Sequence, residues 1–98
     1  MTIQKKKEGA ALTVELDGRL DTMTSPQLET ELRTSLDGIT DLVLDITKLT
    51  YISSAGLRVL LSAQKVMNRQ GAMTIRGASA EIMDIFDVTG FSDILNIE

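Results

Sequence analysis

The stretch "LDITKLTYISSAGLRVLLS", residues 44–62, ends one apolar run and begins another, and two serines, an alanine and a glycine (residues 53–56) separate them. The first run, "DLVLDI" at residues 41–46, is short and largely apolar, as expected for a buried central strand. The second run has helical spacing and predicts a helix from about Ser54 to Gln70, ended by Gly71. Its predicted inner stripe comprises Leu57, Leu60, Leu61, Ala63 and Met67, widened by Val59 and Val66.

The segment before this stretch predicts a hairpin followed by a helix. Ile3–Lys7 and Ala11–Leu16 are expected to be strands joined by a turn at Glu8-Gly9, because apolar and polar residues alternate in the second of them. Ser25 is the expected N-cap of the first helix, with the only proline of the chain directly after it, and Gly38 ends that helix.

The segment after the second helix predicts a strand, a helix and a last short strand. The strand is "AMTIR" at residues 72–76, Ser79 caps the following helix, Gly90 ends it, and "DILNI" at residues 93–97 is the last strand. The order β-β-α-β-α-β-α-β then describes a single α/β domain over residues 1–98.

Strands that alternate with helices favour parallel crossovers, and binding sites in such sheets form where loops leave the carboxyl ends of the strands. We expect three such loops, after the second strand, after residue 46 and at the serine pair. This arrangement predicts that Asp21, Asp45 and Ser54 lie towards one end of the sheet.

The composition excludes several classes of function. The 98 residues include no cysteine and no histidine, which removes disulfides, thiolate and imidazole metal ligands, and the usual base of a Ser-His-Asp triad. A net charge of −4 argues against general nucleic-acid binding, which depends on cations that meet phosphates. The N-terminus "MTIQKKKEGA" lacks the apolar segment of a secretory signal, and no apolar run is long enough to span a bilayer, so we expect a cytoplasmic protein.

Ser54 stands at the predicted start of the second helix, and two interpretations of it follow from the residues. Its hydroxyl can cap the helix, which is worth about 1 kcal/mol. A phosphate on it would instead add roughly −1.5 to −2 charges at a helix N-terminus, where N–H groups and the macrodipole favour an anion. Gly56, which has no side chain, would let the backbone of another chain approach closely.

The same stretch resembles the signature of STAS domains, in particular the small, single-domain anti-sigma factor antagonists. These proteins typically read D-S-[ST]-G-L at the head of their second helix, and the serine after the acidic residue is phosphorylated. Aligned on Gly56 and Leu57, Ser54 falls on that serine. Upstream, "GRLDTMTSPQLE" resembles the G-x-L-D segment of the family and puts Asp21 on its acidic residue, and "IFDVTGFSDIL" resembles the closing helix and strand.

The resemblance implies a STAS-like mixed sheet of four to five strands with an N-terminal hairpin and three to four helices. It implies a binding module rather than an enzyme. In the family, the unphosphorylated antagonist binds an anti-sigma factor, which is also a serine kinase, and so releases the sigma factor; phosphorylation, here of Ser54, ends the association and a serine phosphatase reverses it. We expect no cofactor, no metal, no direct nucleic-acid or membrane binding, and a monomer when free. The residues expected to bind the partner are Asp21, Ser53, Ser54, Ala55, Gly56, Leu57 and Arg58.

Two positions depart from the family pattern. Ser53 stands where the family commonly has Asp, which removes a charge that could orient the hydroxyl for the kinase and leaves Ser53 as a rival acceptor. Ala55 stands where the family commonly has Ser or Thr, and it has no hydroxyl for a second phosphate.

Other functions stay open as alternatives. The main one is a STAS subunit of a membrane (phospholipid) transport complex, which would bind its partner constitutively. A receiver-like domain phosphorylated on Asp45 would need a lysine late in the chain, but none follows Lys65. A hydrolase with Ser54 as nucleophile lacks a histidine base and a G-x-S-x-G elbow.

Charged residues around the serine pair have structural interpretations as well. Asp21 and Asp45 can each simply brace a turn or loop. On the second helix, a basic stripe at helical spacing is either a solvated face or a docking surface for a partner. The basic stripe comprises Arg58, Ser62, Lys65 and Arg69.

Overall fold

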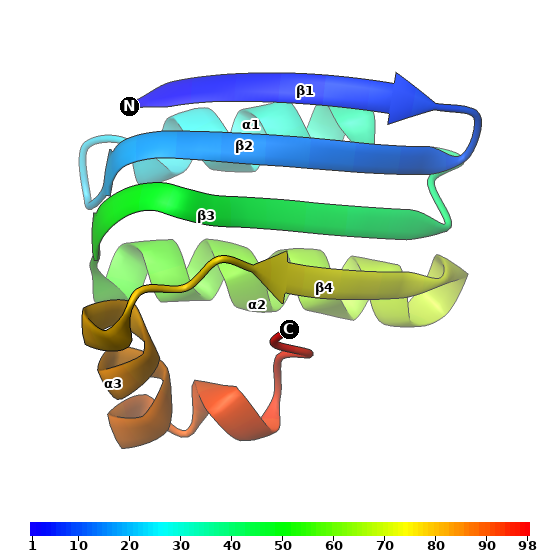
Figure 1. The fold of residues 1–98 in the computed structure, drawn as a ribbon. Coiled ribbons are helices and arrows are strands. Elements are labelled where there is room, and N and C mark those ends of the chain that lie inside the picture. The colour runs from blue at the N-terminus through cyan, green and yellow to red at the C-terminus, as the bar shows by residue number, and fades with distance from the viewer.

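The structure, a computed structural model, describes residues 1–98 as one four-stranded sheet with three α-helices (Figure 1). The predicted α/β class and the order β-β-α-β-α-β-α are confirmed. The elements are β1 (Thr2–Glu8), β2 (Ala11–Leu20), α1 (Ser25–Ser35), β3 (Asp41–Ile52), α2 (Ser54–Gln70), β4 (Ala72–Arg76), α3 (Ala80–Thr89) and the short 3-10 helix η1 (Phe91–Asp93).

The sheet is mixed, with the strand order β1-β2-β3-β4. β1 and β2 form the expected antiparallel hairpin, whereas β2, β3 and β4 run parallel to one another. Helices α1 and α2 lie on the same face of the sheet, and α3 lies beyond β4 (Figure 1). The carboxyl ends of β2 and β3 therefore meet where the chain enters α1 and α2. We call the surface formed by residues 19–24 and 51–58 the carboxyl-end surface.

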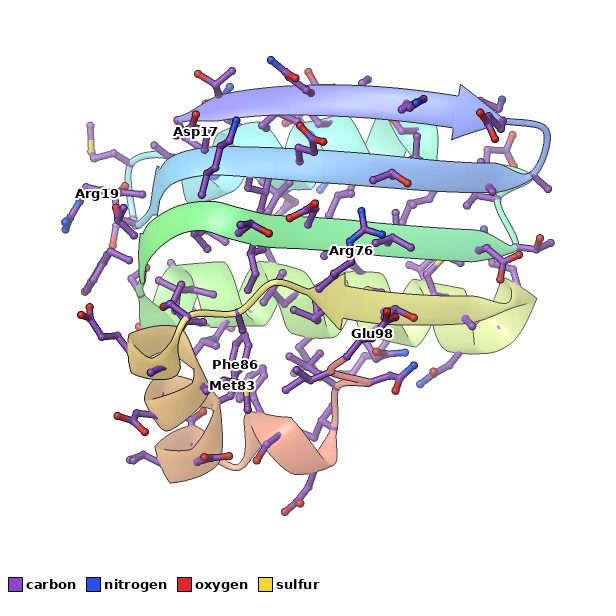
Figure 2. The ribbon with its side chains drawn as sticks, in the orientation of Figure 1. Asp17, Arg19, Arg76, Met83, Phe86 and Glu98 are labelled. Atoms are coloured by element: carbon purple, nitrogen blue, oxygen red, sulfur yellow. The ribbon has the colours of Figure 1, made fainter.

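The core lies between the sheet and the helices and contains 23 buried hydrophobic side chains. Alternate residues of β2 and β3 point into it, because successive side chains of a strand face opposite sides. Most of the predicted stripe of α2 is buried, but Leu61 is half-buried and Val66 is 38% exposed at the margins. Figure 2 shows the fully buried Phe86 on the side of α3 that faces the rest of the molecule.

Strands β2 and β3 are longer than predicted, since they end at Leu20 and Ile52 rather than at residues 16 and 46. Polar residues after position 46 interrupt the apolar pattern that the prediction relied on. The pairing nevertheless continues, through two register shifts along β2, until Leu20 lies opposite Ile52. The loop predicted after residue 46 is therefore part of a strand.

The start of α1 also differs from the prediction. Ser25 is not the N-cap but the first helical residue, and it is buried with its hydroxyl donating to the backbone oxygen of Asp21. Thr24 occupies the cap position without a side-chain capping bond. Ser25 is thus turned inward, and the turn before the helix is braced by the side chain of Asp21.

The C-terminal segment confirms one prediction and corrects another. Ser79 caps α3 as predicted, because its Oγ accepts from the Ile82 N–H (3.2 Å). The predicted last strand is wrong, since η1 uses part of that segment and only one parallel bridge, between Ile75 and Ile97, joins the chain end to β4. The N–H groups of Ile94 and Leu95 donate to the Phe91 carbonyl (3.0 and 2.8 Å), so only the last residues of the chain are left to pair with β4.

The other face of the sheet carries no helix (Figure 1). A hollow of about 210 Å³ opens there, and its acidic side chains do not form a group that could hold a metal ion. None of the helices combines the length and the apolar character needed to cross a bilayer. The residues that line the hollow are Thr2, Gln4, Glu15, Leu16, Asp17, Asp45, Thr47 and Lys48.

Candidate functional site

Ser53 joins β3 to α2 and caps the helix. Its backbone is extended (φ −97°, ψ 174°), its N–H donates to the Leu20 carbonyl (2.9 Å) and its Oγ accepts from the Gly56 N–H (3.3 Å). The Ser53 carbonyl accepts from the Leu57 N–H (2.9 Å). Since this is the geometry of an N-cap, the capping role left open for Ser54 belongs to Ser53.

Ser54 is the first residue of α2, is exposed, and makes no hydrogen bond through its hydroxyl. Ala55 beside it is half-buried, and Arg58, one turn further along the helix, is exposed. The start of α2 therefore presents one free hydroxyl and one cation to solvent. Of the residues predicted to bind a partner, Ser54 and Arg58 are the exposed ones on this helix, and that role stays a prediction.

Gly56 and Leu57 are buried in the core of the chain itself. A Cβ on Gly56 would lie 2.8 Å from Leu20 Cγ, 2.9 Å from Ile52 Cγ1 and 3.0 Å from the Leu20 backbone oxygen, closer than such contacts normally come. The glycine thus lets α2 pack directly on the ends of β2 and β3. Both residues position Ser54, and direct contact with a partner stays a prediction for them.

Asp21 braces the turn between β2 and α1. Its Oδ1 accepts from the N–H groups of Met23 (3.0 Å) and Thr24 (3.0 Å) and from the Thr24 hydroxyl (3.1 Å). These hydrogen bonds, above all the one from the Thr24 backbone, hold the pKa of Asp21 below its ordinary value. The side chain therefore has a structural role, and its carboxylate stays charged at neutral pH close to the start of α2.

Two residues that the sequence analysis did not single out complete this surface. The guanidinium of Arg19 lies over the ring of Tyr51, 4.3 Å from its centroid, and Arg19 Nε lies 3.7 Å from Asp21 Oδ2. Arg19 and Tyr51 are register partners at the ends of β2 and β3, and Figure 2 shows Arg19 at this end of the sheet. Their proximity follows from the strand extensions beyond residues 16 and 46, which the apolar pattern did not reveal.

Asp45 does not belong to this surface, contrary to the prediction. It precedes Ile52, the last residue of β3, by seven positions, roughly 20 Å along a strand. Its Oδ1 accepts from the Thr47 hydroxyl (2.6 Å) and N–H (3.0 Å), and its Oδ2 lies 3.3 Å from Arg76 Nη2. The hydrogen bonds from Thr47, followed by the contact with Arg76, lower the pKa of Asp45. Asp45 therefore braces the middle of β3 against the end of β4.

The basic stripe of α2 is exposed along its whole length. None of its three cations forms an ion pair within the chain, because the four ion pairs of the structure involve other basic residues. The stripe begins one turn after Ser54 and runs away from the carboxyl-end surface. Both interpretations of it, a solvated face and a docking surface, remain.

The sequence profile of the STAS domain family matches residues 2–98 of this chain. The chain belongs to the STAS domain family. BtrV of Bordetella bronchiseptica, named as a candidate anti-sigma factor antagonist, is 34% identical to this STAS domain over 99 residues, which cover 99% of this chain and 85% of BtrV. The anti-sigma-B factor antagonist of Listeria monocytogenes is 30% identical over 97 residues, which cover 96% of this chain and 84% of that protein.

Solved structures confirm the STAS fold. The anti-sigma factor antagonist SpoIIAA in its unphosphorylated form superposes with a TM-score of 0.78 at 15% identity, over 99% of this chain and 87% of that one. The phosphorylated form of Bacillus SpoIIAA gives a TM-score of 0.77 at 16% identity, over 99% of this chain and 91% of that one. At such low identity the likeness concerns the fold alone.

Proposed function

We propose that this STAS domain is an anti-sigma factor antagonist that acts as a phosphorylation switch. The unphosphorylated form binds an anti-sigma factor that is also a serine kinase and thereby releases the sigma factor. Phosphorylation of Ser54 ends the association, and a serine phosphatase restores it. The observation that carries the proposal is the exposed, unbonded hydroxyl of Ser54 at the first position of α2. In this role the protein is a substrate and a ligand rather than an enzyme, as the names of its relatives support.

The geometry favours Ser54 over Ser53 as the acceptor. A kinase needs a hydroxyl that can enter its active site, and Ser54 is exposed, whereas Ser53 is half-buried and its Oγ accepts from the Gly56 N–H. Serine and aspartate are both good N-cap residues. The replacement of the usual Asp by Ser53 therefore keeps the cap of α2 and removes only a charge.

The fold is expected to tolerate a phosphate on Ser54. The group would stand at the N-terminus of a 17-residue helix, where the macrodipole and the backbone N–H groups favour an anion. The similarity of this fold to both forms of SpoIIAA, TM-scores 0.78 and 0.77, supports this expectation.

The cost of the phosphate falls on the complex. A partner that covers the start of α2 would meet a doubly charged group close to Asp21, whose hydrogen bonds keep its carboxylate ionised. An unpaired or like-charge contact of this kind costs about 2 to 4 kcal/mol. Binding would then be roughly 30- to 800-fold weaker.

The proposal can be tested with an ATP-binding anti-sigma factor serine kinase from the organism that carries this gene. Calorimetry would compare its affinity for the unmodified, phosphorylated, Ser54→Ala and Ser54→Asp forms, with circular dichroism as a check of folding. We expect Ser54→Ala to bind nearly as well as wild type and to resist phosphorylation, and Ser54→Asp to bind poorly. As a matched control, Ser53→Ala should still be phosphorylated and released.

Three outcomes would contradict the proposal. Equal affinity for the phosphorylated and unmodified forms would remove the switch. Phosphate mapped by mass spectrometry mainly to Ser53 would overturn the assignment of the acceptor. Constant association with a membrane transport ATPase, whatever the state of Ser54, would favour the transport-complex alternative.

A further inference from the structure

A partner that covers Ser54 must cover much of the carboxyl-end surface as well. Specific interfaces bury about 800 Å² on each protein, and this chain exposes 5516 Å² in total. An interface centred on Ser54 would thus take up about one seventh of the surface. It would extend from the start of α2 across the end of β2 to the turn that leads into α1.

Met23 is the most exposed apolar side chain of that surface, at 86%. Its backbone N–H donates to Asp21 Oδ1 (3.0 Å), so the turn that presents it is braced from within. The side chain contributes almost nothing to the core of the chain. An unbranched thioether adapts to irregular pockets, and for that reason methionine is frequent in protein-binding surfaces.

The accessible charges of the same surface are mostly positive. Asp21 Oδ1 accepts hydrogen bonds within the turn and Asp21 Oδ2 lies 3.7 Å from Arg19 Nε, whereas the side chain of Arg19 is 60% exposed and donates no hydrogen bond. Arg58 is exposed and forms no ion pair. In a chain with a net charge of −4, two such arginines around one hydroxyl indicate a partner with acidic groups.

We infer that Met23 is the apolar anchor and Arg19 the charge-selective residue of the surface that binds the partner kinase. The kinase then presents an apolar pocket bordered by a carboxylate. This inference rests on the proposed function, because it requires Ser54 to lie in the interface. Anchors contribute most of the affinity, and charges at the rim of an interface act mainly on the association rate, so the two residues have separable effects.

The anchor is tested by the affinity of the same kinase for Met23→Ala. Val88→Ala is the matched control, because Val88 is 87% exposed but lies on α3, outside the carboxyl-end surface. We expect binding to weaken about 5- to 30-fold for Met23→Ala and to change by less than about twofold for Val88→Ala. Both melting temperatures should stay at the wild-type value, because neither side chain is buried.

The charge-selective role is tested by the association rate of Arg19→Gln at several salt concentrations. We expect a rate about 3- to 10-fold lower at low salt and a difference that shrinks as salt screens the charges. Arg33→Gln is the control, because that side chain is 71% exposed but lies on α1, outside the carboxyl-end surface. Its rate should match wild type.

The outcomes separate this inference from the proposed function. If Met23→Ala binds as tightly as wild type while Ser54→Asp binds weakly, the anchor is wrong and the switch stands. If wild type, Met23→Ala and Ser54→Asp all bind equally, the proposed function fails and the inference fails with it. A loss of rate for Arg19→Gln that persists unchanged at high salt would contradict the electrostatic role.

Discussion

Replacing Gly56 with alanine would place a methyl group in the junction between α2 and the sheet. That Cβ would lie 2.8 Å from Leu20 Cγ and 3.0 Å from the Leu20 backbone oxygen, which already accepts from the Ser53 N–H. Overpacking of this kind costs about 1–3 kcal/mol, and the higher helix propensity of alanine returns at most about 1 kcal/mol. We expect a net destabilisation of about 1–2 kcal/mol, or a melting temperature lower by roughly 5–15 °C.

Thermal and urea unfolding of Gly56→Ala and wild type would measure this difference. Ser62→Ala is the control, because Ser62 is an exposed position of the same helix, and its change should stay within about 0.5 kcal/mol. Since the methyl group would displace the start of α2, phosphorylation of Ser54 should slow in the same variant.

The packing explanation would be refuted if Gly56→Ala were as stable as wild type. Full stability combined with lost kinase binding would mean that the glycine serves the close approach of a partner, as its lack of a side chain also permits. A loss of stability would support the explanation that Gly56 is needed for close packing against Leu20 and Ile52.

Three further predictions follow from the hydrogen bonds of the structure. Ser53→Ala should destabilise the protein by about 1 kcal/mol through loss of the cap of α2, measured by urea unfolding. The pKa values of Asp21 and Asp45 are lowered in the folded chain, so the unfolded chain takes up protons at a higher pH than the folded one. The contribution of these two groups to stability should therefore be fully present above about pH 4 and be lost as the pH falls further. In Asp45→Asn the melting temperature should depend less on pH in this acid range. Asp21→Asn keeps an acceptor for the turn but loses the charge, so kinase assays should show slower phosphorylation with little change in melting temperature.

The elements that the sequence predicted best are those set by local signals. The bounds of α2 and the cap of α3 at Ser79 agree with the structure, because apolar spacing and capping residues act within one helix. The ends of β2 and β3 were wrong, because pairing between Leu20 and Ile52 is a contact between distant segments. A polar sequence after residue 46 gives no local sign of that partner.

In the candidate site, too, local signals were predicted correctly and contacts between distant segments were not. The motif located Ser54 at the start of a helix, but its spacing could not tell which serine would cap it. That distinction depends on the extended backbone of Ser53 and on its bond to Gly56. The contact of Arg19 with Tyr51 likewise depends on strand register, and no single segment contains that information.

Because the residue at position 53 is an uncharged serine, the carboxyl-end surface has a positive formal charge, which a phosphate on Ser54 can reverse. This surface contains Arg19, Arg58 and one acidic residue, Asp21, which sum to a formal charge of +1. A phosphate on Ser54 adds roughly −1.5 to −2 and makes the sum negative, so a partner with acidic groups is attracted before phosphorylation and repelled after it. With the usual aspartate of the family at position 53, the sum would be zero before phosphorylation. Ser53→Asp should therefore retain the cap but associate more slowly with the kinase at low salt, and an association rate equal to wild type would show that the sign of this surface does not govern binding.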